Sequence, residues 1–217
     1  GVSAPEEEAN LREHEPITNW PAAYFHLPKL FEWMLQQPRH RVYRYLAGLL
    51  KYLQWQHYSA DPKPWILKNP SNIGYEAEMT EALPGIRFIM LHRDPVEAIS
   101  SLASFVSTTR GINSAHPARR EDVLDWALTD FGHAMERHVA WRKANPDAPV
   151  IDVSYADIIN RDEQEVQRVY DFLGRPLTPS AKAGMDKWRA VNAQGKYGKH
   201  EYSASPEEVA RIKQRFA

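Results

Sequence analysis

The sequence predicts an α/β fold in which helices flank a parallel sheet. Three short apolar runs have the length of strands, and they lie at Trp65–Leu67, Arg87–Leu91 and Pro149–Val153. Between them lie segments with apolar residues at helical spacing. Strands that alternate with helices are typical of parallel sheets joined by crossover connections. Three strands are few for a complete α/β domain, so we expect the fold to be N-terminally incomplete.

The helical patterns divide the chain into two parts. We predict helices at 27–37, 42–57, 73–83, 96–109, 121–144, 164–173, 179–191 and 206–216. Pro95 stands at the first turn of one helix, and Gly174 follows the end of another, as their backbone preferences favour. Residues 1–60 are therefore predicted to be a mainly helical segment, and residues 61–217 an α/β region of the same domain.

Composition excludes several classes of function. The formal net charge is -1, so no overall basic field points to a nucleic-acid partner. The chain contains no cysteine, which excludes disulfides, thiolate catalysis and zinc–thiolate sites and fits a cytoplasmic location. No metal-ligand spacing is present, and no apolar run approaches the roughly 20 residues that span a bilayer. Because the start lacks both Met and signal-peptide features, we expect a processed, cloned or partial product.

Two cations follow two of the predicted strands. Lys68 comes directly after Trp65–Leu67, and Arg93 follows Arg87–Leu91 and precedes a predicted helix. In open α/β sheets ligands bind outside the carboxyl ends of strands, and a helix N-terminus adds positive dipole character. Ser101 lies about two helical turns after Arg93 and can share its side of the helix. This pattern favours an anion site, and the alternative is a pair of surface cations with structural ion-pair partners.

The same segments resemble those of sulfotransferases that use 3′-phosphoadenosine 5′-phosphosulfate (PAPS). Residues 93–101 (RDPVEAISS) are similar to the segment that binds the 3′-phosphate, and residues 65–70 (WILKNP) to the segment that supplies a lysine. Residues 153–158, 171–174 and 192–202 resemble the adenine-side, FLG and C-terminal loop segments. The resemblance covers about residues 60–205 and is strongest to the bacterial branch related to tyrosylprotein sulfotransferases.

The resemblance implies a P-loop-NTPase-like sulfotransferase fold and a nucleotide site. Arg93 and Ser101 would hold the 3′-phosphate of PAPS, and of the product PAP. Tyr155 would pack against or hydrogen-bond the adenine, while Lys196 or Lys199 would add charge from the C-terminal loop. Residues 1–60 would then form the acceptor side. No metal is required.

The resemblance also implies in-line transfer, in which positioning and charge stabilisation supply most of the catalysis. Lys68 would neutralise the charge that develops on the bridging oxygen of the donor. A base must take the acceptor proton. Glu7 is favoured for this role over His26, although an acidic run such as Glu6–Glu8 is also typical of a solvated helix start.

One part of the family pattern is missing from the sequence. Sulfotransferases hold the 5′-phosphosulfate on a Gly/Ser/Thr-rich loop, whereas residues 1–60 contain only Gly1 and Gly48. Two alternatives to a sulfotransferase therefore stay open: a non-catalytic module with the same fold, and another nucleotide-dependent, kinase-like enzyme. The partner would be a small-molecule or macromolecular sulfate acceptor, whose identity the sequence does not reveal, and a homodimer is compatible with the chain.

Overall fold

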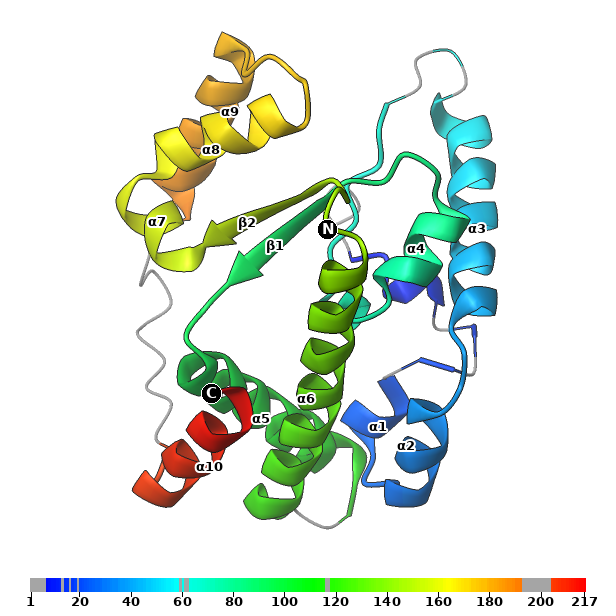
Figure 1. Ribbon diagram of the computed structural model, residues 1–217, viewed down its shortest axis with the longest axis vertical. Helices are drawn as coiled ribbons and strands as arrows, with labels where there is room; N and C mark the ends of the chain where they lie inside the picture. Colours follow the sequence, from blue (N-terminus) through cyan, green and yellow to red (C-terminus); the bar gives the residue numbers. More distant parts are fainter. Residues whose placement is uncertain are drawn as a thin grey trace. The chain divides into compact units, whose positions relative to one another are not determined.

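The chain forms two compact units. The computed structural model describes residues 7–12, 14–15, 17–18, 20–58, 60, 63–115, 118–192 and 204–217 (Figure 1). The first unit comprises the described residues of Gly1–Ile86 and Leu102–Ala148 with Phe216, and the second those of Arg87–Ser101 and Pro149–Arg215 with Ala217. The predicted division after residue 60 separates an acceptor side from a nucleotide side, and it stays a prediction.

The described part of the first unit is helical. It contains α1 (Trp20–Tyr24), α2 (Pro28–Leu35), α3 (His40–Tyr58), α4 (Glu76–Ala82), α6 (Arg120–Ala144) and the C-terminal half of α5 (Pro95–Asn113). Two short 3₁₀ turns, η1 (Asn10–Arg12) and η2 (Pro70–Asn72), accompany them. Apolar residues at helical spacing bury one face of α3, and α4 packs beside it. The core includes Val42, Leu46, Leu50, Met79, Val123 and Ala127.

The second unit carries the parallel sheet that the alternating pattern predicts. Strands β1 (Phe88–His92) and β2 (Val150–Ser154) pair in parallel, in the register Phe88↔Val150 to His92↔Ser154. Their arrows run in the same direction, and α7 (Tyr155–Asn160) begins where β2 ends (Figure 1). The unit continues with α8 (Asp162–Phe172), α9 (Pro179–Val191) and α10 (Pro206–Phe216). The α/β class with a parallel sheet is thus confirmed.

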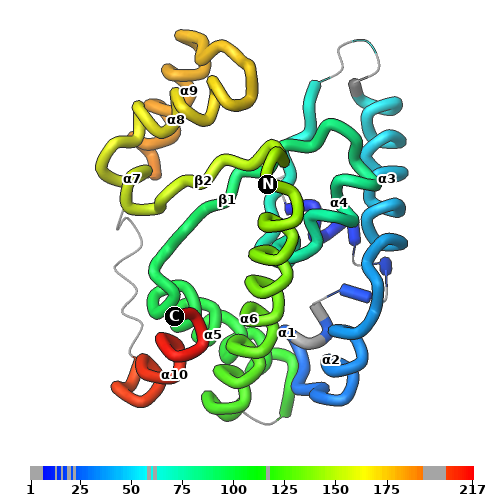
Figure 2. The backbone as a smooth tube through the Cα atoms, in the orientation of Figure 1, coloured from blue at the N-terminus to red at the C-terminus, as the bar shows by residue number. Residues whose placement is uncertain are grey.

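The predicted strand at Trp65–Leu67 is wrong. Residues 63–69 lead from α3 to η2 and α4 as an extended segment with no ladder partner among the described residues (Figure 2). Ile66 is 88% exposed and Trp65 is 39% exposed, so the run is not buried. An apolar run of three residues has the composition of a strand, but it becomes one only where a neighbouring backbone pairs with it.

The helix predicted at 73–83 begins three residues late. η2 and Gly74 come first, and Gly74 has φ +81°, a left-handed conformation that ends regular helical geometry. The Gly74 N–H donates a hydrogen bond to Glu76 Oε1 at 3.1 Å. A Cβ at position 74 would lie 2.6 Å from the carbonyl oxygen of Ala134 in α6, so the turn packs directly against that helix.

Three glycine substitutions should separate backbone strain from steric contact. Gly74→Ala should destabilise the protein by about 2 kcal/mol or more, because it adds both a positive-φ penalty and a clash with α6. Gly85→Ala shares the positive φ, at +79°, but meets no atom within 4 Å, so its cost should be about 1 kcal/mol. Gly48→Ala lies within α3 in open space and should stabilise by up to about 1 kcal/mol. Urea unfolding measures the series, and an equal effect at positions 74 and 85 would contradict the close packing on α6.

Candidate active site

Arg93 and Tyr155 meet at the carboxyl ends of the two strands in the second unit. Arg93 comes directly after β1 and Tyr155 directly after β2, and the register pairs the residues before them, His92 with Ser154. The guanidinium carbon of Arg93 lies 4.9 Å from the centre of the Tyr155 ring. Both side chains are partly exposed, at 37% and 39%. The parallel ladder therefore places a cation and an aromatic ring at one accessible place, the carboxyl end of the sheet.

The start of α5 is already capped by its own chain. Asp94 Oδ1 accepts hydrogen bonds from the N–H groups of Val96 at 2.8 Å and Glu97 at 3.2 Å. The Glu97 carboxylate also receives a hydrogen bond from Arg93 Nε at 3.1 Å. Asp94 thus engages two of the backbone N–H groups at this helix start, and the predicted contribution of the helix N-terminus to an anion site stays a prediction. An incoming anion would compete with Glu97 for Arg93.

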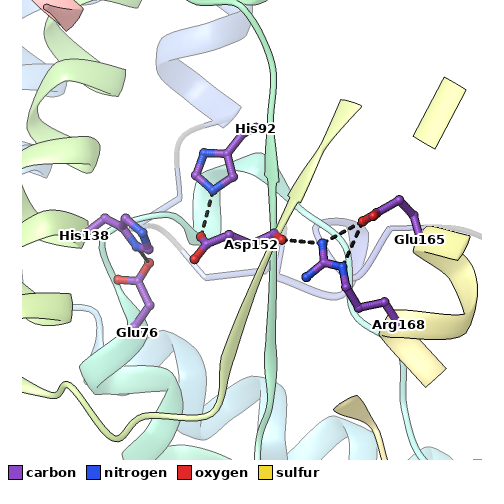
Figure 3. Close-up of polar contacts among 6 residues, drawn as sticks. All are labelled: Glu76, His92, His138, Asp152, Glu165 and Arg168. Carbon is purple, nitrogen blue, oxygen red and sulfur yellow. Dashed lines mark hydrogen bonds and ion pairs between the residues drawn. The ribbon is translucent and has the colours of Figure 1, made fainter. Parts of the chain in front are cut away.

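Polar contacts of Asp152 connect the two strands with α8 next to the carboxyl end of the sheet. His92 Nε2 and Asp152 Oδ1 lie 2.8 Å apart across the β1–β2 ladder (Figure 3). Arg168 of α8 donates through Nη2 to the Asp152 carbonyl at 2.7 Å and to Glu165 Oε2 at 2.6 Å. One residue of β2 thus contacts both β1 and α8, which restrains the chain just before Tyr155.

Lys68 and Glu7, the two predicted catalytic residues, are in contact in the first unit. The Lys68 ammonium and the Glu7 carboxylate form an ion pair. The Lys68 side chain is 71% exposed and that of Glu7 37% exposed, so both are accessible from solvent. The structure therefore brings together an ammonium and a carboxylate that lie far apart in the sequence.

Buried Glu8 holds the backbone beneath that ion pair. Glu8 is 4% exposed, and its Oε2 accepts a hydrogen bond from the backbone N–H of Lys68 at 2.8 Å. Its Oε1 accepts from Asn72 Nδ2 at 2.7 Å, and Asn72 Oδ1 accepts from the Tyr43 hydroxyl at 3.1 Å. Sequence reasoning missed Glu8, Asn72 and Tyr43, because an acidic run is typical of solvated positions and no local pattern marks one carboxylate of the run as buried.

A second buried carboxylate fixes the turn after Lys68. Glu76 Oε1 lies 2.7 Å from His138 Nδ1, and the two side chains are 6% and 7% exposed (Figure 3). The same oxygen accepts the hydrogen bond from Gly74. The start of α4 is thus tied to α6 through a buried polar contact, which limits the freedom of the segment that carries Lys68.

The remaining predicted residues are only partly placed. Ser101 is half-buried on α5, in the second unit with Arg93, and its role toward a phosphate stays a prediction. Lys196 and Lys199 lie outside the described residues. Lys68 and Arg93 belong to different units, so the binding of one nucleotide by both residues also stays a prediction. His26, the other candidate base, is exposed.

The described part of the chain contains neither a cluster of metal-ligating residues nor a membrane-spanning helix. No group of three or more His, Cys, Asp or Glu residues among the described residues could hold a metal ion. No helix formed by those residues is both long and apolar enough to cross a bilayer.

Comparison with known structures defines the class of fold. The chain superposes on a sulfotransferase from Mycobacterium avium with a TM-score of 0.83 and 20% identity, and on one from Mycobacterium tuberculosis with 0.79 and 22%. Each match covers 98% of this chain and 54% of the solved one, so the chain spans about half the length of these structures. At this identity the likeness shows the sulfotransferase fold. No curated protein is similar enough to match.

The family follows from the sequence profile. The family model described as the sulfotransferase family matches residues 3–179, which is most of the chain. This protein therefore belongs to the sulfotransferase family, as the resemblance of residues 65–70 and 93–101 predicts.

The neighbouring residues Glu7 and Glu8 should contribute to stability by different amounts. Glu8→Gln should destabilise the protein by about 2 kcal/mol, because a buried, charged acceptor of two hydrogen bonds is lost. Glu7→Gln removes an exposed ion pair and should cost less than about 1 kcal/mol. Chemical unfolding of both variants tests this, and a larger loss at position 7 than at position 8 would contradict the assignment of Glu8 as the structural residue.

Proposed function

We propose that this protein is a PAPS-dependent sulfotransferase that transfers a sulfuryl group to an acceptor hydroxyl or amine. The observation that carries the proposal is the contact of Arg93 with Tyr155 at the carboxyl ends of β1 and β2. Family membership supports the reaction type, and the Arg93–Tyr155 contact at the carboxyl end of the sheet supports a nucleotide donor.

The side chains at the carboxyl end of the sheet can bind both parts of a 3′-phosphoadenosine group. The Arg93 guanidinium can offer two parallel N–H groups to a phosphate, and the Tyr155 ring offers a flat apolar face to a base. Glu97 holds Arg93 in place through one hydrogen bond, and Tyr155 holds it through the ring contact. Ser101, on the same helix, would add a hydroxyl to the phosphate.

The first unit would supply the groups that act on the transferred sulfuryl group. As the acceptor oxygen or nitrogen bonds to sulfur, the bond from sulfur to the bridging oxygen breaks, and the electron pair leaves with PAP. Lys68 would neutralise that leaving oxygen, and Glu7 would take the acceptor proton. The ion pair between them shows that the two groups lie side by side, which supports a shared role at one reacting centre. Their exposure lets donor and acceptor separate the pair on binding.

Nucleotide selectivity distinguishes this proposal from its alternatives. Saturating PAP should raise the melting temperature of the full chain, whereas ATP at the same concentration should not, because only a bound ligand stabilises the native state. Arg93→Ala should weaken PAP at least about tenfold and suppress the shift. The exposed Arg175 of the same unit serves as the matched control, and Arg175→Ala should keep the shift. Equal shifts with ATP and PAP would favour a kinase-like enzyme, and an undiminished shift in Arg93→Ala would refute the phosphate assignment.

Turnover distinguishes an enzyme from a non-catalytic module. With PAPS and the best acceptor from a panel of phenols, alcohols and amines, Glu7→Gln should lower kcat by about 10²–10⁴, the usual contribution of a general base. Lys68→Ala should also lower kcat, while the PAP-induced shift in melting temperature persists in both variants. The exposed carboxylate Glu81 of the same unit provides the control variant Glu81→Gln. Wild-type kcat in Glu7→Gln would remove Glu7 from the reaction, and the absence of turnover in wild type would favour the binding module.

A further inference from the structure

A histidine–carboxylate pair joins β1 and β2 directly before the residues of the candidate nucleotide site. His92 is the last residue of β1, and Arg93 follows it in the chain. His92 Nε2 lies 2.8 Å from Oδ1 of Asp152 on β2 (Figure 3). Neither His92 nor Asp152 has a role in the proposed reaction. The imidazole thus adjoins, in the chain, the residue that is proposed to bind a phosphate.

The contact with Asp152 determines which imidazole nitrogen can accept a hydrogen bond. An ionised carboxylate accepts hydrogen bonds and does not donate them, so the proton in this contact is on His92 Nε2. In the neutral ring the other nitrogen, Nδ1, then carries a lone pair and is an acceptor. Asp152 is itself restrained, because its carbonyl receives a hydrogen bond from Arg168 of α8 at 2.7 Å. The orientation of the imidazole is thus supported by both β2 and α8.

The second nitrogen of this ring is available to a ligand. The His92 side chain is 48% exposed and that of Asp152 is 47% exposed. No described residue forms a hydrogen bond with His92 Nδ1. A histidine whose one nitrogen is fixed by a carboxylate is typically one that binds or reacts through the other. An acceptor in this position calls for a hydroxyl or an N–H group on the ligand.

We propose that His92 Nδ1 accepts a hydrogen bond from the ribose 2′-hydroxyl of the nucleotide donor, and that Asp152 positions the ring for this contact. The 2′-hydroxyl is the single free hydroxyl of the ribose in PAP, and it is on the carbon next to the one that carries the 3′-phosphate. His92 likewise adjoins Arg93, the proposed ligand of that phosphate. Arg93 lies beyond the last pair of the ladder, so the alternation of faces within a strand does not force the two side chains apart. The assignment rests on the proposed function and makes His92 the residue that distinguishes ribose from deoxyribose.

A purely structural role of the pair is the alternative. Exposed ion pairs and hydrogen bonds between side chains are common and often contribute only a little stability. His40 and Glu81 form such a pair in the first unit, also at 2.8 Å, with side chains that are 46% and 56% exposed. His40 has the same partner type and a similar exposure, but it lies away from the β1–β2 sheet. It is therefore a matched control for His92.

Two nucleotides that differ by one hydroxyl test this proposal. Titration calorimetry of the full chain gives the Kd of PAP and of its 2′-deoxy analogue, and wild type should bind PAP about three- to tenfold more tightly, the usual range for one net hydrogen bond. His92→Gln keeps a donor for Asp152 but lacks the Nδ1 acceptor, so it should bind both nucleotides and lose most of this preference. Asp152→Ala should reduce the preference, whereas Asp152→Asn should retain most of it, because its amide oxygen can still accept from Nε2. The control His40→Gln should keep the wild-type preference.

The possible outcomes separate the role of His92 from the proposed donor. Equal affinity of wild type for the two nucleotides, or the full preference in His92→Gln, refutes the contact with the 2′-hydroxyl and leaves the donor assignment intact. An unchanged preference in His92→Gln together with a loss of kcat of about 10² or more would instead assign Nδ1 to the acceptor proton. A wild-type chain that binds neither nucleotide refutes the donor, and the role of His92 with it. A preference that is lost in His92→Gln and kept in His40→Gln supports the proposal.

Discussion

The parallel pairing of β1 with β2 is the constraint on which the candidate nucleotide site at the carboxyl end of the sheet depends. Side chains at the ends of two strands meet only when the register brings those ends level, and here it pairs His92 with Ser154. The residue that follows each strand is then Arg93 or Tyr155, and the Arg93 guanidinium carbon lies 4.9 Å from the centre of the Tyr155 ring. The contacts of Asp152 with His92 and Arg168 hold the same strands from the side. A shift of one residue in the register would separate the cation from the ring.

In the first unit, buried carboxylates lie next to the exposed ion pair of Lys68 and Glu7, and their charge must be stabilised without water. Glu8 and Glu76 are buried carboxylates: Glu8 accepts hydrogen bonds from the Lys68 N–H and from Asn72, and Glu76 accepts one from the Gly74 N–H. These bonds replace the water that the carboxylates lose, and they restrain the backbone from Lys68 to Glu76. Lys68 and Glu7 are thus solvent-accessible beside a hydrogen-bonded backbone, which suits the roles proposed for them.

Sequence reasoning succeeded where a local pattern carried the information. The helices at α3, α5, α6 and α8 follow from apolar spacing, and the parallel sheet from strands that alternate with helices. It failed at Trp65–Leu67, because an extended run becomes a strand only with a partner that lies elsewhere in the chain. It also missed Glu8, because burial of one carboxylate among several depends on contacts with Lys68 and Asn72, about 60 positions away.

The sequence by itself determined the α/β class, the sulfotransferase family and the positions of Lys68 and Arg93 after their apolar runs. The class follows from periodicity, and the family from the resemblance of residues 65–70 and 93–101 to sulfotransferase segments, and both are properties of neighbouring residues. Only the tertiary structure decided that Glu7 reaches Lys68, that the Arg93 guanidinium lies over the Tyr155 ring, and that Glu8 is buried against the Lys68 backbone. The physical reason is that such contacts join residues distant along the chain, and packing, rather than local preference, selects which of the many possible pairs form.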